Sequence, residues 1–143
     1  MKTRNFKAMG AAVALLLGMG VSSSAQAFVQ GGTLGVSPVA TDIITFNCPA
    51  GTASVRGRIT DAGAPAAAPR VRLGLFAPGI MPVVQSAQEG ASVIVRRAAN
   101  PGTHWAVITK DLLGGENYSV NINCFNAGGA AIGAAGVLVT QNQ

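Results

Sequence analysis

The chain has 143 residues, of which 10% are charged and 49% are hydrophobic, with a formal net charge of +5 and a pI near 10.0. Three of the ten basic residues, Lys2, Arg4 and Lys7, lie in the first seven positions. The sequence after them has seven basic and five acidic residues, and so small an excess argues against a nucleic-acid partner.

The first element in chain order is a predicted signal peptide over residues 1–27. A basic start is followed by a short apolar run, Ala8 to Val21, and by small residues that place Ala25 and Ala27 in an A-x-A cleavage pattern. The apolar run is shorter than the roughly 20 residues that span a bilayer. We therefore expect cleavage near Ala27-Phe28 and a secreted or periplasmic protein that does not span the membrane.

After this leader, apolar and polar residues alternate with the period of two that is typical of half-buried strands. The clearest segments are 43–48, 55–60, 70–75, 92–97, 104–108 and 118–124, and weaker ones are 29–36 and 136–140. Turns rich in Gly, Pro and Asn separate them. This pattern predicts an all-β fold, a two-sheet antiparallel sandwich of jelly-roll or immunoglobulin-like type, without the Trp and Tyr spacing of true immunoglobulin domains. The expected core is Phe46, Ile59, Leu73, Leu75, Val107, Tyr118, Val120 and Ile122.

We interpret residues 28–143 as a single domain of ordinary size. Residues 28–41 form an N-terminal extension in this interpretation. Residues 125–143, which are rich in Gly and Ala, form a C-terminal tail or an edge strand.

Cys48 and Cys124 are the only cysteines in the sequence. An even number of cysteines in a small exported domain predicts a disulfide. A zinc site is disfavoured because the chain has only one histidine to add to these two ligands. We predict no metal and no cofactor.

The order of turns and aromatic residues resembles the bacterial pre-peptidase C-terminal domain, a secreted β-sandwich. The matching segments are Asp42–Phe46, Gly51–Ile59, Leu73–Phe76, Gly102–Ile108 and Gly115–Val120. The resemblance covers residues 42–124 and implies a non-catalytic secreted module. The acidic pair of that family is replaced by Arg70 and Arg72, so the resemblance carries no calcium role.

The sequence offers little for catalysis. His104 is the only histidine, and no G-x-S-x-G motif accompanies it. Paired carboxylates for hydrolysis of a glycoside would have to come from residues that we expect at strand ends or turns, capping and solvated: Asp42, Asp61, Glu89, Asp111 and Glu116. We therefore predict that the protein is not an enzyme.

Two pairs of arginines, Arg56 with Arg58 and Arg70 with Arg72, have the i, i+2 spacing that places each pair on one face of a strand. If the two strands are neighbours, four guanidinium groups form a stripe that suits carboxylate, sulfate or phosphate groups. The alternative is an ordinary solvated sheet face.

These observations favour a small, secreted, non-catalytic binding or structural module of the bacterial envelope or the extracellular space. Its expected partner is an anionic envelope polymer or another surface protein. One alternative is a self-assembling surface or fimbrial-type subunit, in which the Gly-rich flanks act as exchangeable edge strands. A hydrolase is the third alternative.

Overall fold

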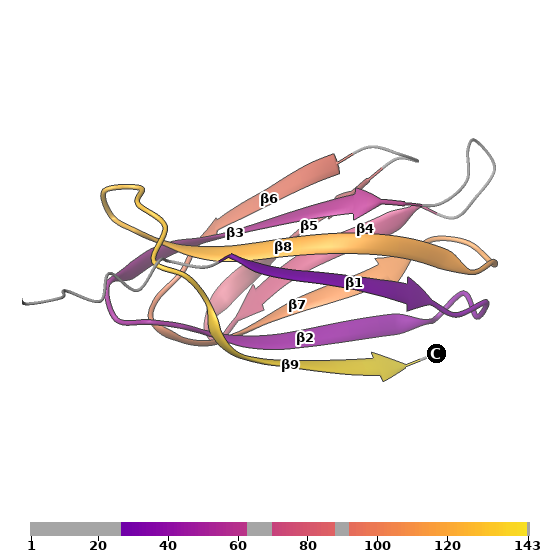
Figure 1. Cartoon of the computed structure of the whole chain (residues 1–143), viewed down its shortest axis with the longest axis horizontal. Coiled ribbons are helices and arrows are strands. Elements are labelled where there is room, and N and C mark those ends of the chain that lie inside the picture. Colours follow the sequence, from indigo (N-terminus) through magenta and orange to yellow (C-terminus); the bar gives the residue numbers. More distant parts are fainter. Residues whose placement is uncertain (1–26, 63–69, 88–91, 143) are drawn as a thin grey trace, which may run out of the picture.

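The computed structural model describes residues 27–62, 70–87 and 92–142, and the regular structure in these ranges consists of nine strands without a helix (Figure 1). The strands are β1 (Phe28–Leu34), β2 (Thr41–Cys48), β3 (Thr52–Asp61), β4 (Val71–Ala77), β5 (Ile80–Ser86), β6 (Ser92–Ala98), β7 (Gly102–Lys110), β8 (Glu116–Asn126) and β9 (Ala135–Asn142). The predicted leader, apart from Ala27, lies outside the described residues. Among the residues described, no helix has the length and apolar character needed to cross a bilayer.

The strands form two antiparallel sheets that pack against each other as a sandwich. One sheet has four strands in the order β1-β8-β3-β6, and the other has five in the order β5-β4-β7-β2-β9. Figure 1 shows the edge strands β1 (indigo) and β9 (yellow) on the same side of the sandwich. The predicted fold class, a two-sheet β-sandwich, is confirmed.

Alternation along each strand produces the core between the sheets. In β2, Ile44, Phe46 and Cys48 are buried, whereas Ile43 and Asn47 are exposed. The same period of two buries one face of β3, β4 and β8, as expected for sheets with one solvated face. The predicted core residues that are fully or almost fully buried are Phe46, Ile59, Leu73, Leu75, Tyr118, Val120 and Ile122.

The prediction was wrong for the inward face of β7. His104, Ala106 and Ile108 point into the core, while Trp105 and Val107 are only half-buried on the outer face. Both faces of this strand carry apolar side chains, so alternation alone does not identify the inner one. Val107 therefore does not belong to the core.

Three edge strands lie in segments where the strand pattern of the sequence is weak or absent. β1 comes from the segment interpreted as an extension, and β9 comes from the Gly/Ala-rich tail. β5 was not predicted at all. It contains Pro82 and pairs only with β4, which fits the restriction of proline to edge strands.

The disulfide between Cys48 and Cys124 is present and joins the two sheets. Cys48 ends β2 and Cys124 lies near the end of β8, with a Cα–Cα distance of 5.7 Å and a sequence separation of 76. Both residues are buried. The predicted pairing is confirmed.

Several charged side chains are buried, contrary to the expectation that the acids are solvated at strand ends. Asp42, Asp61 and Glu116 are at most 2% exposed. Asp61 accepts a hydrogen bond from the backbone N–H of Val71 at 3.3 Å. Lys110 is also buried, and its ammonium group donates to the carbonyls of Gly35 and Gly114. Buried ionic groups need such partners because their desolvation is costly.

Candidate functional site

β3 places two arginines on the outer surface of the four-stranded sheet. Val55 and Ile59 point into the core, so the intervening Arg56 and Arg58 point outward. Arg56 is half-buried and Arg58 is exposed. The predicted pair therefore lies on a solvent-facing sheet surface.

The neighbouring strand β6 adds a third arginine. Arg96 is exposed and lies directly opposite Arg56 in the antiparallel register of β3 and β6. Two like charges directly opposite each other across strands destabilise a sheet. We call the outer surface that carries Arg56, Arg58 and Arg96 the arginine face.

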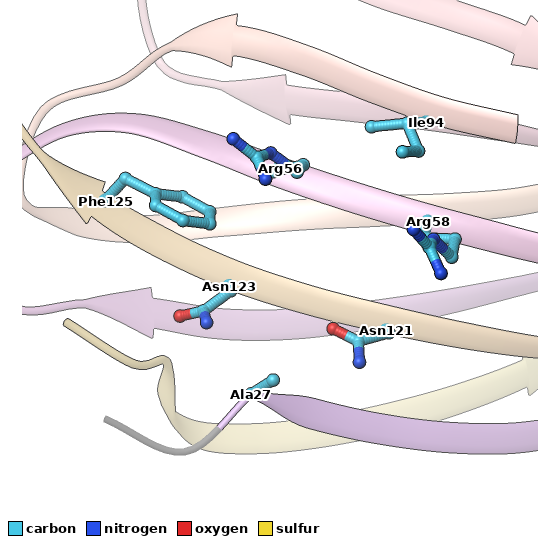
Figure 2. A pocket seen from close by; sticks show the side chains of 7 residues that line it. All are labelled: Ala27, Arg56, Arg58, Ile94, Asn121, Asn123 and Phe125. Atoms are coloured by element: carbon cyan, nitrogen blue, oxygen red, sulfur yellow. The ribbon is translucent and has the colours of Figure 1, made fainter. Parts of the chain in front are cut away.

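β8 forms the other flank of this surface and contributes an aromatic ring. The guanidinium carbon of Arg56 lies 4.3 Å from the centroid of the Phe125 ring, a cation–π contact. The Nε–H of Arg56 is buried and has no hydrogen-bond partner within the described residues. Phe125 thus packs against the guanidinium group of Arg56 (Figure 2).

Two asparagines of β8 line the same surface. Asn123 lies opposite Arg56 and Asn121 lies opposite Arg58. The side-chain oxygen of Asn123 accepts a hydrogen bond from the N–H of Gly133 at 3.1 Å, so its amide NH₂ is oriented for other acceptors. Asn121 in turn lies opposite Val29 of β1.

Arg56, Arg58 and their neighbours on β8 line a pocket of about 330 Å³. Figure 2 shows them around this hollow: Ala27, Arg56, Arg58, Ile94, Asn121, Asn123 and Phe125. A volume near 300 Å³ is the lower end of the range for small-molecule sites. The pocket therefore suits one unit of a longer ligand or one small anion.

The arginine face carries positive charge that its own strands do not neutralise. The acidic residues of β3 and β8, Asp61 and Glu116, are buried on the opposite side of the sheet. The planar donors of the guanidinium groups match carboxylate and phosphate oxygens. The chemistry available here is recognition of an anion, with amide groups for additional polar contacts.

The other predicted pair lies elsewhere, so the four arginines do not form one stripe. Arg72 belongs to β4, in the five-stranded sheet, and Arg70 directly precedes that strand. Asp111 contacts both residues. Its Oδ1 accepts a hydrogen bond from the backbone N–H of Arg70 at 2.7 Å, and its Oδ2 lies 3.7 Å from the Arg72 guanidinium. The stripe required β3 and β4 to be neighbours, but the chain changes sheets between them.

Arg97, the sixth arginine of the domain, is structural. It is 6% exposed, and its guanidinium donates to the carbonyls of Leu75 at 2.8 Å and Ala98 at 3.2 Å. Burial lowers the pKa of this group from its ordinary value. Arg97 thereby joins β6 to β4 of the opposite sheet.

His104 is also a core residue. It is 2% exposed, its ring stacks on Phe46 at 5.6 Å between centroids, and its Nε2 lies 2.8 Å from the carbonyl oxygen of Asn100. It lines a second pocket of about 230 Å³, and the described residues of its wall include no Asp, Glu, Lys or Arg. Within the ranges described, no three His, Cys, Asp or Glu side chains are grouped to hold a metal ion.

Comparison with known proteins found no matching family model and no matching curated protein.

Proposed function

We propose that the protein is a secreted, non-catalytic module of the bacterial envelope that binds an anionic polymer on its arginine face. The observation that carries this proposal is the placement of Arg96 directly opposite Arg56. Such a pair lowers stability in the free protein, and stability is typically given up where a site serves function. An anion that binds both arginines would remove the repulsion.

The backbone spacing of the three arginines suits a polymer with repeated anionic groups. Adjacent strands lie about 4.8 Å apart, and residues i and i+2 of one strand lie about 6.7 Å apart. The backbones of Arg96 and Arg56 are separated by the first distance, and those of Arg56 and Arg58 by the second. A chain with a carboxylate or phosphate on each unit can engage more than one of these residues at once.

A binding assay with matched variants tests the proposal. The test variant is Arg56→Gln/Arg58→Gln/Arg96→Gln, and the control is Arg70→Gln/Arg72→Gln, which removes charge from the other sheet. The probes are polygalacturonate, which carries carboxylates, polyphosphate, and neutral dextran. We expect the parent and the control to bind an anionic probe but not dextran, and the triple variant to bind about tenfold or more weakly. The probe that binds more tightly identifies the anionic group.

Salt provides a second readout of the same contact. Raising the ionic strength from about 0.1 M to about 1 M shortens the screening length from about 10 Å to about 3 Å. Binding should weaken accordingly. Equal binding by the triple variant and the parent, or salt-independent binding, would contradict the proposal.

A second function, self-assembly through edge strands, is favoured by a different observation. β1 and β9 both end a sheet on the same side of the sandwich. Neither strand contains a charged residue or a proline, the usual protection of exposed edges against pairing with another chain. Val29 and Leu138 on these strands are 61% and 63% exposed.

The oligomeric state of the purified domain tests this alternative. Self-assembly predicts concentration-dependent oligomers in light scattering, which Val29→Lys or Leu138→Lys should dissociate. A monomer at all accessible concentrations would exclude it.

A further inference from the structure

The predicted cleavage site lies at the start of β1 and at the wall of the pocket on the arginine face. β1 begins at Phe28, the residue expected to start the mature chain. Ala27, the residue expected to leave with the signal peptide, lines the pocket of the arginine face together with Arg56, Arg58 and Asn121 (Figure 2). Removal of the leader therefore changes the wall of this pocket.

The start of β1 is held in place by packing and pairing. Phe28 is packed against the hydrophobic core and lies opposite Ile122 of β8. The next residue, Val29, lies opposite Asn121, which lines the pocket. Cleavage before Phe28 leaves its backbone nitrogen at the pocket edge, but as an ammonium group in place of an amide.

We propose that signal-peptide cleavage completes the anion site by placing the α-ammonium group of Phe28 at the edge of the pocket, across β8 from Arg56 and Arg58, where it contacts the bound anion. This inference rests on the proposed function and extends it to maturation of the protein. In the uncleaved chain the same position is a neutral peptide bond, and Ala27 occupies part of the pocket wall. The cleaved form should therefore bind anions more tightly than the precursor.

The surroundings make the new amine the titrating group of this pocket. Among the described residues, the charged side chains that line the pocket are Arg56 and Arg58 of β3, and the lining residues from β8 and β6 are uncharged. The adjacent segments 49–51 and 127–134 contain no charged residue. Arginine stays protonated at all working pH values, whereas an α-amino group titrates between neutral and mildly alkaline pH.

Selective acetylation of the N-terminus provides the test. Lys110 is the only lysine in residues 28–143, and it is buried, so acetylation near neutral pH modifies the Phe28 amine. The experiment compares three proteins by their affinity for polygalacturonate and polyphosphate: mature protein starting at Phe28, its N-acetylated form, and a form extended through Ala27 by Gly-Ser. Thermal denaturation confirms that all three are folded.

We expect the acetylated and extended forms to bind about tenfold more weakly at pH 6, the loss expected for one charge-assisted contact. The affinity of the mature form should fall by a similar factor between pH 6 and pH 9, and that of the acetylated form should stay constant. Equal affinity of the three forms, or the same pH profile with and without acetylation, would overturn the inference and leave the arginine site intact. No binding by any form would overturn the proposed function together with it. A secreted protein whose N-terminus, measured by mass spectrometry, differs from Phe28 would also overturn the inference.

Discussion

The hydroxyl of Tyr118 donates a hydrogen bond to Oδ2 of Asp42 at 2.6 Å, and both side chains are buried. Tyr118 belongs to β8 and Asp42 to β2, so this bond joins the two sheets. The same two strands are joined near their other ends by the Cys48–Cys124 disulfide. β2 and β8 are thus tied together at two points, one covalent and one polar.

Removal of the tyrosine hydroxyl should weaken the second tie. In the Tyr118→Phe variant the buried Asp42 carboxylate loses a charge-assisted donor, and we expect a loss of about 1–3 kcal/mol in the free energy of unfolding. Urea denaturation at neutral pH measures this change. A loss below about 0.5 kcal/mol would show that the hydrogen bond adds nothing to the stability of the sandwich.

The same bond predicts sensitivity to alkaline pH. Burial, the hydrogen bond to Asp42 and the charge of Asp42 all raise the pKa of Tyr118 above its ordinary value. In the unfolded chain the phenol loses its proton near pH 10, so the stabilisation is complete below that pH and is lost as the pH rises above it. Tyr118 is the only tyrosine, and its absorbance near 295 nm reports its ionisation directly. Denaturation between pH 8 and pH 11 should show a decline that Tyr118→Phe lacks, and identical pH profiles would contradict this assignment.

Loss of the disulfide should cost more than loss of the hydrogen bond. The bond closes a loop with a sequence separation of 76, for which chain entropy gives about 4 kcal/mol. The double variant Cys48→Ala/Cys124→Ala should lose an amount of this order in chemical denaturation. Mass spectrometry of the unreduced parent should show no alkylatable thiol, and two free thiols would contradict the pairing.

Truncation of a side chain should lower the free energy of unfolding more on the inner face of the five-stranded sheet than on its outer face. Leu75 is fully buried, so Leu75→Ala should lower the free energy of unfolding by about 2–5 kcal/mol. Val107 is half-buried on the outer face, and Val107→Ala should cost clearly less. Equal losses in the free energy of unfolding, measured by chemical denaturation, would show that Val107 belongs to the core.

Features set by local sequence were predicted well, and features set by pairing between distant strands were not. The alternation around Phe46 and Leu75 identified strands and core directly. On β7, apolar residues on both faces concealed that Ile108 rather than Val107 points inward. β5 was missed because its short run has Pro82 and no clear alternation.

The site depends even more on non-local information. The sequence shows that residues 56 and 96 are arginines, but their position directly opposite each other follows from the pairing of β3 with β6. The separation of Arg72 from Arg58 follows from the crossing of the chain between sheets. Phe125 was assigned to the tail, and only the register of β8 places its ring under Arg56.

The most direct test of anion binding by the arginine face is chemical denaturation of the parent and Arg96→Gln at low ionic strength, with and without the anionic probe that binds more tightly. Without the polymer we expect the variant to be more stable by about 0.2–1 kcal/mol, because the repulsion with Arg56 is removed. With the polymer the parent should gain more stability than the variant, since a ligand stabilises the folded state that binds it. A parent that gains no stability from the polymer, or a variant that gains as much, would contradict anion binding by the arginine face.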